Sequence, residues 1–169
     1  MPQGNFIAAA NHFSFLDSLV LGVAISRKIH YLVSRKIYKV EWLRWFMHGS
    51  ETIPIRSISN RAVDLLMRNR CVGLFPEGRV SRNGKLQEFK RGVALLAHKT
   101  GRPIVPCAIL GTYEALPIGA KLPKCTPIKV KIGKPIYVPK EFGHWMGDGY
   151  MQEVTNKVRS AIEEMLNAG

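Results

Sequence analysis

A histidine and an aspartate five residues apart have the types and spacing of a general base and its orienting carboxylate. They are His12 and Asp17, the ends of the stretch HFSFLD. An imidazole that donates one nitrogen's hydrogen to a carboxylate can take a proton from a substrate hydroxyl with its other nitrogen. Five residues turn through about 500° on a regular helix, so the two side chains would not share a helical face. The pair therefore needs a turn between its members.

The flanking segments are suited to supply that turn. The apolar run Phe6–Ala10 is typical of a short buried strand, and Asp17–Ile25 is typical of the opening turns of a helix. Open α/β sheets commonly bind ligands at the carboxyl ends of their strands. Two structural interpretations stay open beside the catalytic one. Ser14-x-x-Asp17 fits a helix-capping pattern, and a single histidine near a turn is often only a hydrogen-bond donor.

A second motif, Phe75-Pro76-Glu77-Gly78-Arg79, follows the buried run Cys71–Phe75. Because parallel strands end at one edge of a sheet, the two motifs can share a pocket. We therefore predict an α/β fold with a mixed, mostly parallel sheet flanked by helices. The apolar periodicity also predicts strands at Ile29–Ser34, Glu51–Arg56, Ile104–Leu110 and Ile128–Lys134, and helices at Arg35–His48, Asn60–Arg70, Val93–Lys99 and a last segment with Val154, Val158 and Ile162.

The composition indicates one globular domain over residues 1–169, with 46% hydrophobic and 22% charged residues. The net charge of +13 points to an acidic partner, which nucleic acid, an anionic lipid surface or a phosphorylated small molecule could each supply. No apolar run approaches the roughly 18 residues of a spanning helix, and no signal-peptide pattern is present. The three widely spaced cysteines predict neither a disulfide framework nor a zinc site, so a reducing cytoplasmic setting is the default.

Taken together, NHFSFLD and FPEGR resemble the glycerolipid (lysophospholipid) acyltransferase family, whose first block is NHxSxxD and whose third is FPEG. Two weaker stretches add to the resemblance, namely Gly49–Arg56 as the second block and Ile104–Leu110, with Pro106, as the fourth. Phe89-Lys90-Arg91-Gly92 also matches the F-K-x-G sequence that the family often shows. The similarity runs from Ile7 to about Val138, with the blocks in family order.

This resemblance implies a glycerol-3-phosphate acyltransferase-like fold and transfer of a fatty acyl group to a lysophospholipid hydroxyl. The donor would be a thioester on coenzyme A or acyl carrier protein, with no other cofactor and no metal. The favoured acceptor is 1-acyl-sn-glycerol 3-phosphate, which would give phosphatidic acid. His12 would be the base and Asp17 its orienter. Arg56, Glu77 and Gly78 fall on positions with which the family binds the glycerol-phosphate portion.

The residue chemistry is compatible with this implication. An arginine can donate two parallel hydrogen bonds to phosphate oxygens, and the candidates for this contact are Arg56 and Arg79. The chain reads FPEGRVSR where FPEGTRSR is common, so Arg79 or Arg82 takes over the phosphate contact, or the acceptor head group differs. The tetrahedral oxyanion needs N–H donors, near a helix start or at Gly78. Without GxSxG or a reactive cysteine, direct attack is favoured, and Ser14 as a covalent nucleophile remains the lesser alternative.

Other functions fit less well. A nucleic-acid-binding module would explain the charge but matches no known motif, so we expect no nucleic-acid partner. A metal-dependent hydrolase built on His12, Asp17 and Glu77 has too few ligands at recognisable spacing. A non-catalytic lipid-binding relative would lack the His–Asp pair. An acyltransferase for a different lysolipid, or a basic module that binds nucleic acid or anionic lipid without catalysis, stays as the alternative.

We expect a peripheral protein at the cytoplasmic face of a membrane. The predicted basic helix Arg35–His48 carries Trp42 and Trp45, which suit contact with an anionic membrane surface. Family members usually have a membrane-associating helical stretch before the first block, and only ten residues precede Asn11 here. We therefore expect either a natural short form or a fragment that lacks this N-terminal segment.

Overall fold

The computed structural model describes residues 1–34, 53–55, 60–139 and 147–168. The predicted helix Arg35–His48, with Trp42 and Trp45, lies outside the described residues. So does Arg56, the predicted phosphate ligand. Of the strand predicted at Glu51–Arg56, the described part forms β3 at Ile53–Ile55.

The described strands form one six-stranded sheet in the order β3-β2-β4-β1-β5-β6. Neighbouring strands from β3 to β5 pair in parallel, and only β6 runs antiparallel, beside β5 at the edge. The predicted mixed, mostly parallel α/β sheet is confirmed. The strands span Ile7–Ala10 (β1), Ile29–Ser34 (β2), Ile53–Ile55 (β3), Cys71–Leu74 (β4), Ile104–Leu110 (β5) and Lys129–Ile132 (β6).

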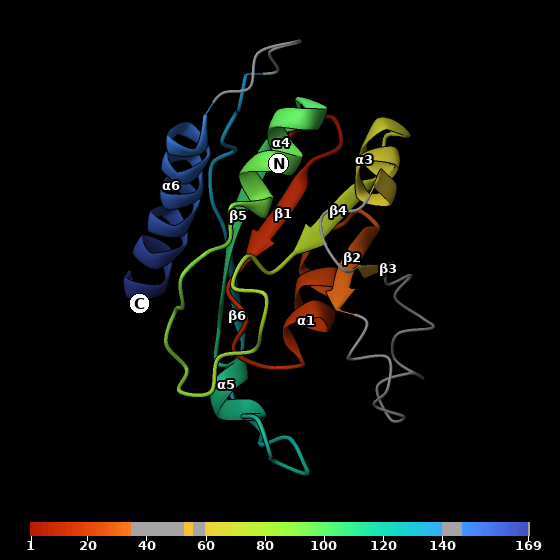
Figure 1. Ribbon diagram of the computed structural model, residues 1–169. Helices are drawn as coiled ribbons and strands as arrows, with labels where there is room; N and C mark the ends of the chain where they lie inside the picture. Colours follow the sequence, from red (N-terminus) through yellow and green to blue (C-terminus); the bar gives the residue numbers. More distant parts are fainter. Residues whose placement is uncertain (35–52, 56–59, 140–146, 169) are drawn as a thin grey trace.

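Helices cover both faces of this sheet (Figure 1). Helices α3, α4 and α6 pack on one face, and α1 packs on the other. The helices predicted within the described residues form with ends shifted by a few residues, whereas the single turn α5 is too short to leave a periodic pattern. Their bounds are Asp17–Ala24 (α1), Asn60–Met67 (α3), Gly92–Thr100 (α4), Thr112–Ala115 (α5) and Asp148–Asn167 (α6). None of the helices in the described ranges is long and apolar enough to cross a bilayer.

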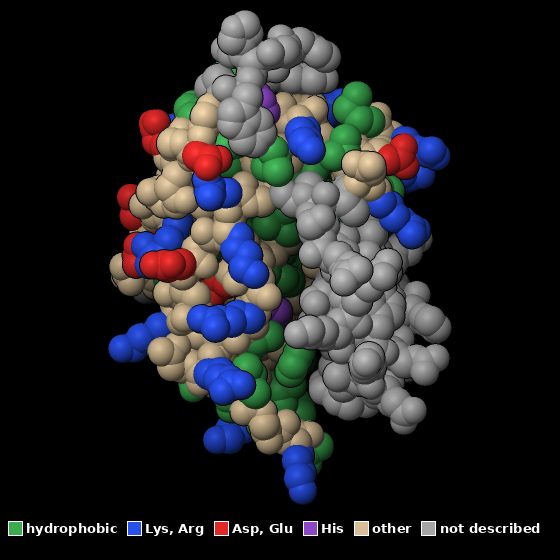
Figure 2. All heavy atoms as spheres, viewed as in Figure 1, with side chains coloured by type: hydrophobic (Ala, Val, Ile, Leu, Met, Phe, Trp, Pro, Cys, Tyr) green, Lys and Arg blue, Asp and Glu red, His purple; other side chains and the backbone are tan. Residues whose placement is uncertain are grey.

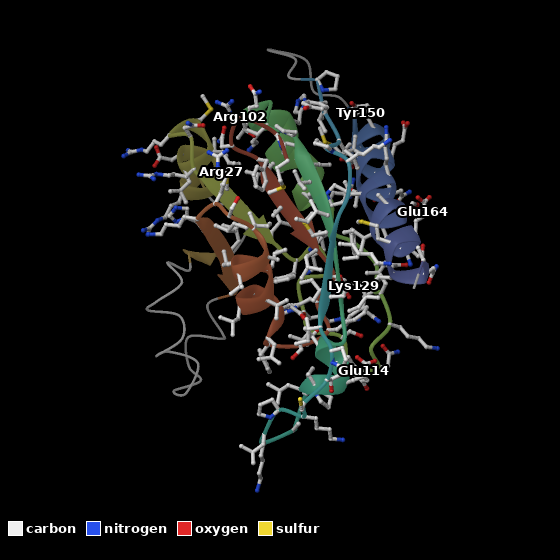
Figure 3. All side chains as sticks on the ribbon, turned by 180° about the vertical axis from the view of Figure 1, so that it is seen from behind. Arg27, Arg102, Glu114, Lys129, Tyr150 and Glu164 are labelled. Carbon is white, nitrogen blue, oxygen red and sulfur yellow. The ribbon has the colours of Figure 1, made fainter. Side chains whose placement is uncertain are left out.

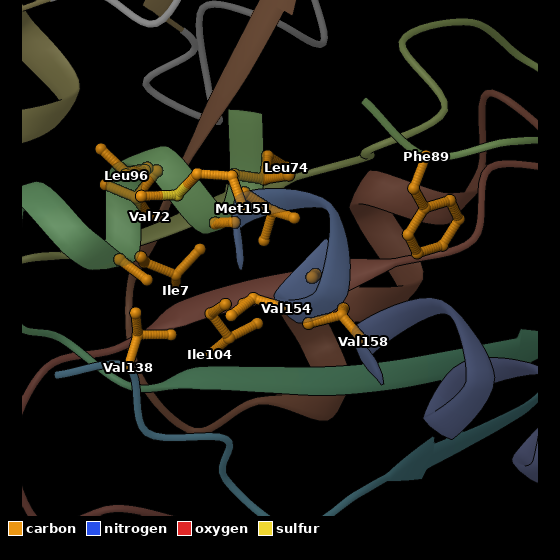
Figure 4. Packing of buried hydrophobic residues seen from close by; sticks show 14 of the residues in the cluster. Ile7, Val72, Leu74, Phe89, Leu96, Ile104, Val138, Met151, Val154 and Val158 are labelled. Carbon is orange, nitrogen blue, oxygen red and sulfur yellow. The ribbon is translucent and has the colours of Figure 1, made fainter. Parts of the chain in front are cut away.

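The central strand β1 is fully buried, and its residues alternate between two cores. Ile7 and Ala9 face the core under α3, α4 and α6, while Ala8 and Ala10 face the core under α1. Figure 4 shows the larger core, where Val154 of α6 lies beside Ile104 of β5 and Met151 of α6 lies near Val72 and Leu96. A strand buried on both faces reads as a continuous apolar run, which is why this segment was recognisable in the sequence.

The carboxyl ends of β1, β4 and β5 meet at one edge because these strands are parallel neighbours. Each strand is followed there by a different segment. His12 follows β1, the Phe75–Arg79 motif follows β4, and α5 follows β5. This edge lies toward the lower end of the molecule in Figure 1, and His12 and the Phe75–Arg79 motif follow the strands that end there.

Candidate active site

Asn11 controls how the chain leaves the sheet after β1. Its side chain is fully buried, and its amide pairs with one residue of β5. Asn11 Oδ1 accepts the Ile109 N–H at 2.7 Å, and Asn11 Nδ2 donates to the Ile109 carbonyl at 2.9 Å. A continued β1 would have paired these two groups with its backbone, so the Asn11 side chain satisfies them in place of the backbone. The backbone is thereby free to turn away at His12.

The loop after β4 holds the His12 backbone from both sides. The His12 N–H donates to Glu77 Oε1 at 2.7 Å, and the His12 carbonyl accepts the Ser81 N–H at 2.7 Å. The ring of His12 stacks on Phe75, with centroids 4.0 Å apart and planes 14° from parallel. The two sequence motifs are therefore joined through His12 itself.

The predicted pair of His12 and Asp17 is formed. His12 Nδ1 lies 2.9 Å from Asp17 Oδ2, and the same oxygen accepts the Phe13 and Ser14 N–H groups at 2.6 and 2.8 Å. Asp17 is fully buried, whereas the His12 side chain is 13% exposed. An ionised carboxylate only accepts, so the imidazole hydrogen belongs on Nδ1. That leaves Nε2 as the nitrogen able to take a proton from a bound hydroxyl.

Glu77 is buried, at 3% exposure, and its two oxygens bridge two loops. Oε1 accepts the His12 N–H, and Oε2 accepts the Gln87 N–H at 3.0 Å. Burial raises the pKa of Glu77, and it outweighs the opposing effect of the hydrogen bonds from His12 and Gln87. The family resemblance implied a substrate contact at Glu77. The contacts that the structure shows are with the backbone N–H groups of His12 and Gln87.

Gly78 has a left-handed backbone, with φ of +69°, and the side chain of Lys90 lies across it. A Cβ at Gly78 would stand 2.7 Å from Lys90 Nζ and 3.0 Å from Lys90 Cε, so a larger residue would displace this lysine. The Gly78 N–H donates to the Phe75 carbonyl at 3.0 Å. That hydrogen already has an acceptor within the turn, so of the two kinds of oxyanion donor that the sequence left open, this geometry does not favour Gly78.

The loop beside His12 carries cations that have no carboxylate partner among the described residues. Within the described residues, the lysine and arginine ion pairs are Arg68–Asp64, Arg91–Asp148 and Arg159–Glu163. Figure 2 shows Lys and Arg side chains gathered on the face over which this loop runs in Figure 1. Such a surface suits an anionic substrate. The exposed and unpaired cations of the loop are Arg79, Arg82, Lys85 and Lys90.

Ser14 is fully buried and orients the loop. Its Oγ donates to the Leu116 carbonyl at 2.7 Å and accepts the Leu16 N–H at 3.2 Å. The residue at the N-cap of α1 is Leu16, and the cap has no side-chain hydrogen bond, so the prediction of Ser14 as helix cap is wrong. Since the hydroxyl hydrogen points at a carbonyl rather than at a base, the geometry does not favour Ser14 as a nucleophile.

The alternative of a metal-dependent hydrolase needs several ligands in one place. In the part of the chain that the structure describes, His, Cys, Asp and Glu form no group of three or more that could hold a metal ion. The carboxylates of Asp17 and Glu77 face backbone N–H groups instead.

Sequence reasoning missed the residues that position His12. A polar residue directly after a buried strand was a usable signal for Asn11. Ser81 and Gln87 act through their backbone N–H groups, which leave no signal in a side-chain pattern. Phe75 was recognised only as part of a motif, because its stacking partner lies far away along the chain.

Comparisons with known proteins find matches in one family. The family model described as Acyltransferase matches residues 1–110. The 1-acyl-sn-glycerol-3-phosphate acyltransferase BAT2, chloroplastic, of Brassica napus is 28% identical over 92% of this chain and 46% of its own length. LPAT1, chloroplastic, of Arabidopsis thaliana, which carries the same enzyme name, is 27% identical over 95% and 45%. The chain thus spans about half the length of these curated relatives.

A solved structure is similar over nearly the whole chain. It is the 1-acyl-sn-glycerophosphate (LPA) acyltransferase PlsC from Thermotoga maritima, with a TM-score of 0.70 and 27% identity. The match covers 98% of this chain and 68% of that one.

Proposed function

The chain belongs to the acyltransferase family, and on this basis we propose that it transfers a fatty acyl group from a thioester to the free hydroxyl of a lysophospholipid. The observation that carries the proposal is the pairing of His12 Nδ1 with buried Asp17 at 2.9 Å, which leaves Nε2 as a base. The favoured acceptor is 1-acyl-sn-glycerol 3-phosphate, the substrate for which the relatives are named. The product would be phosphatidic acid.

The mechanism is direct attack in a complex of both substrates. His12 Nε2 removes the proton of the acceptor hydroxyl as its oxygen attacks the thioester carbonyl. Asp17 holds the ring in the required tautomer and stabilises the imidazolium that forms. When the tetrahedral intermediate collapses, the C–S bond breaks and the leaving thiolate takes the proton from His12. The thiol is that of coenzyme A or acyl carrier protein, and both donors remain within the proposal.

The phosphate of the acceptor is proposed to bind the cations beside His12. Arg79 is exposed on the loop that follows the Phe75–Gly78 turn, and Lys90 Nζ lies over Gly78. Arg56, which the family resemblance assigns to the same task, remains a sequence-based prediction. Hydrogen bonds between a cation and a phosphate are shorter and stronger than neutral ones, so these contacts would orient the hydroxyl toward Nε2.

The site of action proposed for this protein is the surface of a membrane, as a peripheral protein at its cytoplasmic face. The lysophospholipid resides in the bilayer, and the net charge of +13 favours an anionic lipid surface. A different lysolipid acceptor is the alternative within the same chemistry. It would be favoured if the phosphate-bearing acceptor gave no turnover.

The experiment is an activity panel on purified protein and two variants. Acyl-CoA and acyl carrier protein donors are tested against lysophosphatidate, glycerol 3-phosphate and other lysolipids. His12→Ala should abolish transfer, and Asp17→Asn should lower kcat by about 10⁴-fold, because the wrong tautomer disables the base. Asp64→Asn, at an exposed surface ion pair, is the matched control and should keep full activity. A folded His12→Ala protein with near wild-type turnover would contradict the mechanism.

A further inference from the structure

A loop with exposed apolar side chains projects from the end of the molecule that carries the site. It comprises residues 116–127 and follows α5, which it extends away from the sheet in Figure 1. The loop is closed at its base, where the Lys124 N–H donates to the Ala115 carbonyl at 2.7 Å. Near its tip, Ile118 is 43% exposed and Leu122 is 79% exposed.

The loop lies at the same sheet edge as His12. Ser14, two residues beyond His12, donates from its Oγ to the carbonyl of Leu116, the first residue of the loop. Figure 3 shows Glu114 of α5 at this end of the molecule and Arg27 and Arg102 at the opposite end. A partner bound to this loop would therefore lie on the same side of the protein as His12.

The charges of the loop are of one sign. No aspartate or glutamate occurs between Ala115 and Pro139, and the loop carries Lys121 and Lys124, both exposed. Neither lysine forms an ion pair within the described residues. Apolar side chains interleaved with lysines and without carboxylates have the composition of a segment that lies in a lipid interface.

Exposed apolar residues also occur elsewhere, including Leu19 and Val23 on α1, a helix that carries no lysine or arginine. Met67 is 52% exposed at the end of α3, and Tyr137 is 72% exposed beside the residue that pairs with Ile104, the first residue of β5. Both stand at the amino-end edge of the sheet, away from His12. Isolated exposures of this kind are normal in soluble proteins. They supply matched controls for the loop.

We propose that the 116–127 loop docks this protein on an anionic bilayer, with Ile118 and Leu122 inserted at the boundary of the acyl chains and Lys121 and Lys124 among the phosphates. This orientation turns His12 toward the lipid surface. The inference rests on the proposed function for why the site must face a membrane, but the docking itself requires no catalysis. An acidic protein, such as an acyl carrier protein, is the rival occupant that the test below separates.

The loop carries its own attachment point for a reporter. Of the three cysteines, Cys71 and Cys107 are buried and Cys125 is exposed within the loop. A polarity-sensitive thiol dye therefore labels Cys125 selectively in the intact protein. The labelled protein is mixed with vesicles of phosphatidylcholine and phosphatidylglycerol in a two-to-one ratio, or of phosphatidylcholine alone. We expect the dye emission to shift to the blue with the anionic vesicles and to change much less with the neutral ones.

Sedimentation of unlabelled variants with the same vesicles tests the side chains. The double variant Ile118→Ser, Leu122→Ser should bind about tenfold more weakly or worse, because the apolar area no longer leaves water. The double control Met67→Ser, Tyr137→Ser should bind like the wild type. Lys121→Gln with Lys124→Gln should lower binding at low salt and reduce its salt dependence.

Three results would overturn the proposal. One is vesicle binding without any change at the dye on Cys125, since another surface would then contact the lipid. Another is equal binding by the Ile118→Ser, Leu122→Ser variant and the wild type. The third is a dye response to acyl carrier protein but not to vesicles, which would assign the loop to a protein partner.

The proposed function is tested separately with a short-chain, water-dispersed lysolipid. The Ile118→Ser, Leu122→Ser variant should turn over this acceptor at the wild-type rate and lose activity only on vesicle-borne acceptor. If this variant matched the wild type on both the water-dispersed and the vesicle-borne acceptor, the docking role would be rejected. A wild-type protein that inserts its loop but transfers no acyl group would refute the proposed function alone.

Discussion

Replacing Glu77 with glutamine keeps the size of a buried side chain and removes one of its two hydrogen-bond acceptors. The carboxylate accepts the His12 N–H at 2.7 Å and the Gln87 N–H at 3.0 Å. A glutamine can accept one of these bonds through its oxygen, but its NH₂ group then faces the other N–H, donor against donor. Glu77→Gln therefore leaves one backbone donor without a partner in a buried place.

The magnitude follows from that single lost acceptor. A buried donor without a partner costs about 1–3 kcal/mol, so the free energy of unfolding should fall by that amount. If the unpaired donor is the His12 N–H, the imidazole shifts relative to the hydroxyl of the bound lysophospholipid. Misplacement of a catalytic group by about 1 Å can cost 10²-fold, so we expect kcat to fall by about 10- to 100-fold. The KM for the acceptor should change little, because Glu77 itself lies at 3% exposure behind the backbone.

The assay combines urea unfolding with steady-state kinetics on the folded variant. Glu88→Gln is the matched control, since Glu88 lies on the same loop but is exposed, and it should resemble the wild type in both measurements. One result would refute the reasoning. If Glu77→Gln keeps its stability and kcat but raises the KM for the acceptor, Glu77 contacts the substrate, as the family resemblance implied.

Further predictions concern the neighbours of this carboxylate. Asn11→Ala should lower the free energy of unfolding by about 1–3 kcal/mol, measured by urea titration, because both backbone groups of its β5 partner lose their hydrogen bonds. Gly78→Ala should be destabilised by about 1–2 kcal/mol on the same measure, since φ of +69° penalises a Cβ. Arg79→Ala and Lys90→Ala should each weaken acceptor binding by about 1.5–3 kcal/mol with less effect on the donor, and unchanged KM values in both would place the phosphate elsewhere. Because burial raises the pKa of Glu77 above its ordinary value of 4.5, the folded state binds this proton more tightly than the unfolded chain. The stability of the wild type relative to Glu77→Gln should therefore fall as the pH rises above 4.5, and unfolding midpoints compared across pH test the sign.

Much of the fold could be predicted because the informative patterns are local. Short apolar runs such as Ile7–Ala10 and Cys71–Leu74 indicate strands buried on both faces, and the helical segments between them favour parallel pairing. Parallel strands end at one edge, so placing His12 and Glu77 at the same edge of the sheet needed no knowledge of the strand order. The His12–Asp17 pair is also local, since five residues and one turn separate its members.

The roles of the polar residues were decided by tertiary structure. In the strand order, β1 lies between β4 and β5, which come from distant parts of the chain. That order sets Glu77 against the backbone of His12, 65 residues away, and Asn11 against Ile109, 98 residues away. A carboxylate in a sequence motif is equally suited to a substrate or to a backbone N–H. The sequence alone thus determined which groups could do the chemistry. Only the packed sheet decided which of them stay open to a substrate, because a buried polar group must bond to whatever donor or acceptor the fold places beside it.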